Sequence, residues 1–102
     1  MDIQGLVGVT VTNVGDCEDK SAISVTATAQ VVEITTGYDT LELRNVGSYT
    51  VYYGGTSVTA ATGFPIYKRE WRSWNNIKSG FKVYVVCSNG QTSELRRIEY
   101  ET

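Results

Sequence analysis

The chain has 102 residues, of which 41% are hydrophobic and 20% are charged. These values exclude a disordered tract, and the length predicts a single domain over residues 1–102 with a thin core. The sequence contains no histidine, which removes the usual general base, the usual metal ligand and every Ser-His or Cys-His nucleophile pair. We therefore expect a non-enzymatic domain that uses no cofactor and no metal.

Charge is distributed unevenly along the chain, whose net charge is −2. Residues 1–43 hold one base against seven acids, whereas residues 44–102 hold eight bases against four acids. An acidic chain lacks the broad basic surface that nucleic-acid binding usually needs, so no nucleic-acid partner is expected. Two oppositely charged halves suit head-to-tail contact between identical subunits.

The amino-terminal region carries no sign of membrane insertion. Residues 1–10, MDIQGLVGVT, begin with an acid and lack the basic segment and continuous apolar stretch of a secretory signal. No apolar run in the sequence approaches the roughly 18 residues of a membrane span. We expect a protein that is either cytoplasmic or carried outside by something other than a leader of its own. Residues 1–6 are interpreted as a flexible arm that could add a strand to a neighbour.

The first half of the sequence alternates in the manner of β-strands. Val7, Val9 and Val11 predict one strand, residues 13–20 predict a polar loop, and alternation resumes over residues 23–31. The phase then slips at residues 31–32, which predicts either a β-bulge or a crossing from one sheet to another.

The second half adds strands that are separated by clear turn signals. Residues 41–43 lead a strand that ends at an Asn-x-Gly turn. Residues 50–53 form the next strand, which stops at Gly54-Gly55. These two glycines are expected to supply the positive φ angles of a turn. Pro65 suits a turn or a strand edge. No lysine follows the glycines, so a phosphate-binding loop is excluded.

Residues 66–80 are the one segment where a helix can be argued. Ile66, Glu70 and Trp74 could share a helical face, but Ser73 and the β-rich surroundings favour a strand followed by a loop. Residues 81–88 alternate strongly, Asn89-Gly90 is a hairpin signal, and residues 92–100 form the last strand. The sequence predicts about eight short antiparallel strands in a small β-sandwich or a partly closed barrel.

Cysteines and carboxylates give weak signals for chemistry. Cys17 and Cys87 have no metal-ligand spacing, and two reduced thiols are favoured over a disulfide. Asp16, Glu18 and Asp19 could offer oxygens to calcium, but their spacing does not match an EF-hand, and a solvated loop is the better interpretation.

Residues 67–78, YKREWRSWNNIK, look like a binding surface. Arginine beside aromatic residues is typical of protein contact hot spots and of single-stranded nucleic-acid platforms, and tryptophan with asparagine is typical of sugar-binding surfaces. Alternatively, the tryptophans fill the core and the basic residues are solvated. The residues chosen as a candidate partner interface are Tyr67, Arg69, Trp71, Arg72 and Trp74.

Turn and core positions between residues 40 and 100 carry a resemblance to a known group of proteins. The positions that match are Asn45, Gly47, Val51, Tyr53, Gly54, Gly55, Val58, Thr59, Gly63 and Pro65. In this pattern the chain resembles small β-structured virion proteins of tailed bacteriophages, including head-decoration and fibre-type proteins. Such proteins usually have a bland linker after the proline strand, where this chain has KREWRSWNN.

The resemblance implies a non-enzymatic structural subunit that is displayed in many copies on the virion and assembled in the host cytoplasm. It implies a homo-oligomer, most simply a trimer, whose partners are the major capsid protein or other virion proteins. The leading hypothesis is a head-decoration or cement protein that binds between capsid subunits. The alternative is a fibre or tail module that recognises host surface glycan.

Overall fold

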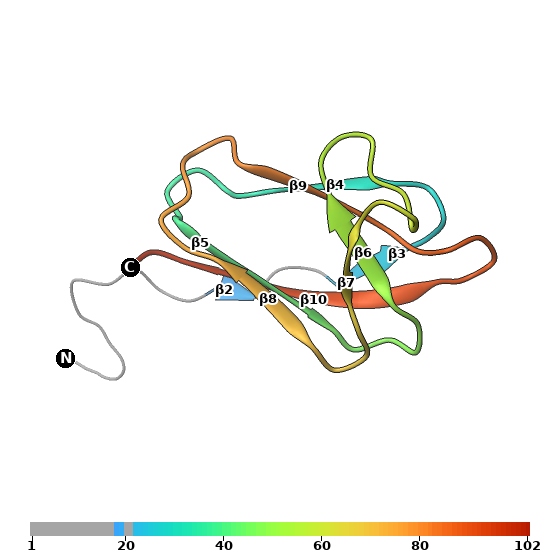
Figure 1. Cartoon of the computed structure of the whole chain (residues 1–102). Helices are drawn as coiled ribbons and strands as arrows, with labels where there is room; N and C mark the ends of the chain where they lie inside the picture. Colours follow the sequence, from blue (N-terminus) through green and yellow to red (C-terminus); the bar gives the residue numbers. More distant parts are fainter. Residues whose placement is uncertain (1–17, 20–21) are drawn as a thin grey trace.

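The computed structural model describes residues 18–19 and 22–102 and shows two antiparallel sheets that face each other (Figure 1). The five-stranded sheet has the order β2-β10-β5-β8, with β3 also pairing with β10, and the four-stranded sheet has the order β4-β9-β6-β7. The strands are β2 (Glu18–Asp19), β3 (Ile23–Val25), β4 (Gln30–Glu33), β5 (Thr40–Asn45), β6 (Val51–Gly54), β7 (Phe64–Ile66), β8 (Trp71–Trp74), β9 (Lys82–Val86) and β10 (Ser93–Tyr100). The expected all-β fold is confirmed, and because the sheets do not close, it is a β-sandwich rather than a barrel.

The core lies between the sheets and follows from strand alternation. In β5, Leu41 and Leu43 are fully buried, whereas Arg44 is exposed on the other face. The four-stranded sheet contributes branched side chains in the same way. The buried apolar cluster comprises Val25, Val32, Ile34, Leu41, Leu43, Val51, Ile66, Val83, Val85, Cys87 and Leu95.

The predicted strand over residues 23–31 is two strands in different sheets. β3 pairs with β10 in one sheet and β4 pairs with β9 in the other, with a bend over residues 26–29 between them. The chain does cross from one sheet to the other, but it does so before Gln30. Residues 31–32 lie within the continuous strand β4, so the prediction of a bulge or a crossing at that position is wrong. The change of phase arises in β4, which turns the buried side chain of Val32 toward the core and leaves Val31, which is 50% exposed, on the outer face.

Local predictions are wrong in part at three places. Residues 18–19 were expected in a loop but form β2, because the backbone of β10 is available to pair with them at residues 98–99. Gly54 and Gly55 do not take positive φ angles, unlike Gly90, whose φ is 78°. Asn89-Gly90 does form a turn, but the predicted hairpin is wrong, because the turn joins β9 to β10 and these two strands lie in different sheets. The predicted strand at residues 7–11, the arm at residues 1–6 and Cys17 lie outside the described residues.

The loop over residues 55–63 folds back onto the outer face of the four-stranded sheet. At residue 63 its backbone approaches the side chains of Tyr52 and Val58 so closely that only glycine fits. A Cβ atom on Gly63 would lie 2.8 Å from the Cβ atom of Tyr52 and 2.8 Å from Cγ2 of Val58. Val58 and Val86 are buried, with only 8% and 4% of their surfaces exposed. The loop thus covers apolar side chains that a bare sheet would leave in water.

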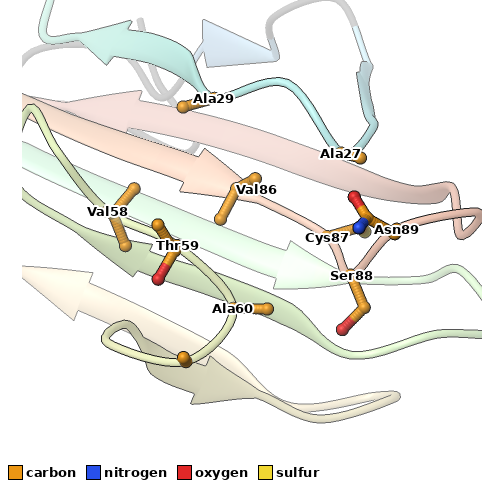
Figure 2. A pocket seen from close by; sticks show the side chains of 10 residues that line it. Ala27, Ala29, Val58, Thr59, Ala60, Val86, Cys87, Ser88 and Asn89 are labelled. Carbon is orange, nitrogen blue, oxygen red and sulfur yellow. The ribbon is translucent and has the colours of Figure 1, made fainter.

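Beside this loop lies a cavity of about 500 Å³ with small side chains around it (Figure 2). Ala27 and Ala29 lie on one side, Val58 to Ala61 on another, and Val86 to Asn89 complete the wall. Its one ionisable side chain is the Cys87 thiol, whose pKa is raised because the thiol is buried. The lining offers no acid–base pair.

An ion pair within β10 makes hydrogen bonds to the chain of the other sheet. Glu99 of β10 is fully buried, and its Oε2 atom lies 2.5 Å from the guanidinium of Arg97. Arg97 also donates to the backbone carbonyl of Glu33, and Oε1 of Glu99 accepts from the backbone N–H of Thr35 at 2.9 Å. The pair therefore ties β10 of the five-stranded sheet to the chain at and after β4.

Candidate binding surface

Strand β8 divides the candidate interface residues between two faces. Residues that lie opposite each other in an antiparallel ladder share a face, and β8 pairs Trp74 with Leu41 and Arg72 with Leu43. Because Leu41 and Leu43 are core residues, Trp74 and Arg72 point inward. Trp71 lies opposite Arg44 and points outward, with 54% of its surface exposed.

Trp74 belongs to an aromatic cluster at the edge of the core. Its ring meets that of Tyr53 edge to face, with ring centres 5.3 Å apart, and the centre of the Phe81 ring lies 6.2 Å away. Tyr53 lies in the opposite sheet, so these contacts hold the two sheets together. In this chain Trp74 contributes to the fold.

Arg72 links β8, an edge strand of the five-stranded sheet, to β7, an edge strand of the four-stranded sheet. Its guanidinium donates to the carbonyl oxygen of Pro65 in β7 at 2.7 Å and to the carbonyl oxygen of Trp71 at 2.8 Å. Its third contact, at 3.4 Å, is to Oε1 of Glu70. Three acceptors inside the chain leave Arg72 little capacity to bind a partner.

Trp71 lies in a row of three residues across the outer face of the five-stranded sheet. Arg96 of β10, Arg44 of β5 and Trp71 are successive cross-strand neighbours. The guanidinium carbon of Arg44 lies 5.5 Å from the centre of the Trp71 ring, which is a cation–π contact. Arg96 is paired with Glu94 at 2.8 Å. The cation–π contact holds an exposed aromatic ring and an exposed cation next to each other.

Asn45 ties together the two loops beside this row. Its side-chain amide is fully buried and donates to the carbonyl oxygens of Tyr49 at 2.8 Å and Ile66 at 2.9 Å. The amide oxygen accepts from the Gly47 N–H at 3.0 Å and from the Ser93 hydroxyl at 2.9 Å. All four hydrogen bonds of one amide are thus satisfied, and they fix residues 45–50 against residues 66–71.

The two tied loops gather exposed apolar side chains. Tyr67, Tyr49 and Val46 are 54%, 47% and 45% exposed, and they come from these loops. Beside Trp71, residues 69–72 line a depression of about 260 Å³. We call the following residues the loop-end surface: Arg44, Val46, Tyr49, Tyr67, Arg69 and Trp71.

The candidate interface of the sequence analysis overlaps with this surface only in part. Tyr67, Arg69 and Trp71 belong to it, and the sequence pattern missed Arg44, Val46 and Tyr49. A signal existed for Arg44, since it alternates out of phase with Leu41 and Leu43 and so had to point away from the core. Val46 and Tyr49 carried no such signal, because hydrogen bonds between residues far apart in the chain, chiefly those of the Asn45 amide, bring their loop beside residue 71.

Few titratable groups in the described part of the chain depart from ordinary behaviour. The pKa of Asp39 is lowered, chiefly because the backbone N–H and the hydroxyl of Thr102 donate to its carboxylate. Within residues 18–19 and 22–102, no group of three histidine, cysteine, aspartate or glutamate side chains could hold a metal ion. The same residues form no helix that could cross a membrane.

Comparison of the chain with protein-family models, with curated proteins and with solved structures found no match. The loop-end surface therefore has to be interpreted from its own chemistry. It combines exposed aromatic rings, arginines and a rigid backbone, which is the composition of a contact surface.

Proposed function

We propose that this chain is a head-decoration protein of a tailed bacteriophage, a non-enzymatic subunit that attaches to the capsid through its loop-end surface. The observation that carries the proposal is the exposure of Trp71 and Tyr67 beside Arg44 and Arg69 on a surface that Asn45 holds rigid. The resemblance of residues 40–100 to phage virion proteins supports the proposal that the chain is part of a phage virion.

The loop-end surface suits adhesion more than chemistry. Tryptophan, tyrosine and arginine are the residues that dominate binding energy at protein interfaces. A rigid surface loses little conformational entropy when it binds, so more of the contact energy appears as affinity. Many copies on a capsid lattice would add modest single contacts into firm attachment.

The proposal is tested by co-sedimentation of the purified protein with expanded empty phage heads. Trp71→Ala should lower its affinity for heads by about tenfold or more, since removal of a central hot-spot residue costs about 2 kcal/mol. Val31→Ala is the matched control, because Val31 is similarly exposed but lies on β4 of the other sheet. Wild-type protein that stays in the supernatant, or equal losses for both variants, would refute the proposal.

A second candidate is a host-recognition module that binds surface glycan. The observation in its favour is the depression of about 260 Å³ beside Trp71, where the exposed aromatic ring lies next to the Glu70 carboxylate. Sugars stack on aromatic rings, and their hydroxyl groups donate hydrogen bonds to carboxylates. A glycan array distinguishes the candidates: this one requires binding that Trp71→Ala abolishes, and an array without signal removes it.

A further inference from the structure

β8 lies at one end of the five-stranded sheet, and among the described strands it pairs with β5 alone. The N–H of Asn45 donates to the carbonyl of Glu70 at 2.9 Å, so alternation along the ladder makes Arg72 and Trp74 the residues that hydrogen-bond to β5. The residue between them, Ser73, therefore points its N–H and C=O away from β5. Ser73 is also exposed, so its backbone is available to a strand that aligns with β8.

The neighbouring strand edge is closed by the chain itself. β7 lies beside β8, since the guanidinium of Arg72 donates to the carbonyl oxygen of Pro65 at 2.7 Å, and Pro65 has no N–H to offer. Arg72 also donates to the carbonyl oxygen of Trp71, at the start of β8. Of the residues in β7 and β8, Ser73 is thus the one that keeps both backbone groups open. An added strand would be directed to β8 and centred on Ser73.

An aromatic row lies on the inner side of this opening. The ring centres of Phe64 and Tyr53 are 5.7 Å apart, and those of Tyr53 and Trp74 are 5.3 Å apart. Phe64 is 65% exposed, the highest value among the large hydrophobic residues that the structure describes. Residues of an added strand that lie opposite Arg72 and Trp74 would share their inward face and point toward this row. Apolar side chains at those two positions would remove Phe64 from water.

The outer side of the opening favours an acidic partner. A residue of the added strand opposite Trp71 would lie next to the exposed Arg44, whose guanidinium carbon is 5.5 Å from the centre of the Trp71 ring. Within the described residues Arg44 forms no ion pair, so it can attract a carboxylate. Ser73 lies opposite Glu42, and a neutral residue therefore suits the position opposite Ser73.

We propose that the β8 edge binds an extended segment of a partner protein by antiparallel strand addition, with apolar side chains toward Phe64 and Trp74 and a carboxylate toward Arg44. Hydrogen bonds to the Ser73 backbone supply affinity, and the alternating side chains supply specificity. From its amino end, the segment reads apolar, neutral, apolar, acidic. The inference deepens the proposed function, on which it rests only for the identity of the partner as a capsid protein.

Fluorescence anisotropy with the labelled hexapeptide TVTVEV, amidated at its carboxyl end, tests the strand addition. N-methylation of its third residue, whose N–H would donate to Ser73, should weaken binding about tenfold. N-methylation of its fourth residue, whose N–H would point away from β8, should leave binding unchanged. Lysine in place of glutamate should weaken binding severalfold, by less at high salt. A wild type that does not bind the peptide, or equal binding of the two methylated peptides, would overturn the proposal.

Variants of the protein locate the contact on β8. Ser73→Pro removes an N–H that the ladder with β5 does not use, and proline is tolerated in edge strands, so the variant should fold and bind the peptide about tenfold more weakly. Ser73→Ala keeps the N–H and should bind like the wild type, whereas Phe64→Ser should bind severalfold more weakly. Far-ultraviolet circular dichroism checks the fold, and the methylated peptides decide alone if Ser73→Pro does not fold. Undiminished binding to folded Ser73→Pro would contradict the contact.

Two further measurements separate this inference from its alternatives. Light scattering after size-exclusion chromatography reports self-association: a wild type that assembles, with a Ser73→Pro variant that does not, would show that a second copy occupies the edge and would overturn the choice of partner. Co-sedimentation with phage heads tests the proposed function. A protein that binds the peptide but not heads would remove only the proposed function, and one that binds heads but not the peptide would remove only this inference.

Discussion

The two outer faces of the sandwich differ in how far the chain covers their apolar side chains. On the four-stranded sheet, the loop over residues 55–63 buries Val58 and Val86, and Gly63 lets that loop approach the strands. On the five-stranded sheet, Trp71 stays half in water beside Arg44. The chain thus covers Val58 and Val86 of one outer face with its own backbone, while Val31 on the same face stays 50% exposed, and it leaves an aromatic ring on the other face without a cover.

This difference separates residues that hold the fold from residues available to a partner. A covered side chain contributes to the free energy of folding, so its loss is measured by unfolding. An exposed ring on a rigid surface contributes little to folding, and its loss is measured by binding. Substitutions of covered side chains should therefore lower the free energy of unfolding, whereas substitutions of exposed side chains on the other face, which we call the open face, should lower binding.

The largest effect is expected at Asn45, which fixes the loops of the open face. Asn45→Ala leaves the buried carbonyl of Ile66, the buried Ser93 hydroxyl and the part-buried carbonyl of Tyr49 without their partner. Unsatisfied buried groups cost about 1–3 kcal/mol each when nothing replaces the partner, so we expect a loss of about 3 kcal/mol in the free energy of unfolding. Urea denaturation measures it.

Ser93→Ala is the control for Asn45. It removes one hydrogen bond to the amide oxygen and leaves the two loops tied, so its cost should be about 1 kcal/mol. Equal costs for the two variants would show that Asn45 does not join the loops as described.

A smaller loss is expected on the covered face at Gly63. In Gly63→Ala the new methyl would lie 2.8 Å from Val58 Cγ2 and 3.1 Å from the Thr59 carbonyl oxygen, so the covering loop must shift. Overpacking of this kind costs about 1–3 kcal/mol. Gly55→Ala meets nothing within 4 Å and has no positive φ, so it should stay within about 0.5 kcal/mol of the wild type. Two variants of equal stability would show that the loop does not pack as described.

The sequence predicted most of the fold because the fold depends on local patterns. Alternation identified most of the strands, and Asn89-Gly90 marked a turn, since both signals act between near neighbours in the chain. The predicted hairpin at that turn was wrong, because the pairing partners of β9 and β10 are set by the two sheets and not by the turn that joins them. The role of Gly54 was misjudged because positive φ is a local property, whereas its close approach to Val58, whose Cγ2 would lie 3.0 Å from an added Cβ atom, depends on tertiary packing. Gly55 has neither a positive φ nor a close neighbour.

The candidate surface was only partly predictable for the same reason. Composition identified the segment around Trp71, but the division of Trp71 from Trp74 depends on the register of β8 with β5, which composition does not contain. Arg72 looked like a contact residue because it is charged, whereas in the structure it braces two sheet edges. Tyr49 reaches the surface through a hydrogen bond to Asn45, and nothing in its own neighbourhood predicted that.

Cys87 provides a pH-dependent measure of burial in the core. Burial raises the pKa of its thiol, so above the ordinary cysteine pKa the unfolded chain has lost a proton that the folded chain retains. Stability should therefore fall as the pH rises through the ordinary cysteine value towards the raised one. Urea midpoints of a Cys17→Ser background between about pH 7 and pH 9.5 measure the decline.

Cys87→Val in the same background should flatten that pH dependence, because it removes the thiol and keeps an apolar side chain. Native alkylation of Cys87 should be slow in the wild type and faster in Gly63→Ala, whose loop is displaced beside the cavity. Stability that rises with pH in the wild type would contradict the burial of the thiol.

The smallest effect on folding is expected at Trp71. Trp71→Ala and Arg44→Ala should each change the free energy of unfolding by less than about 0.5 kcal/mol, because both side chains are exposed and Trp71 contacts Arg44 more than the core. A double-mutant cycle should give a coupling of about 0.5 kcal/mol or more for the cation–π contact. The same Trp71→Ala protein should nevertheless lose most of its binding to heads, so that stability and binding separate at one residue. A loss of more than about 1 kcal/mol in stability would show that the ring is packed, and the distinction between the covered and the open face would not hold.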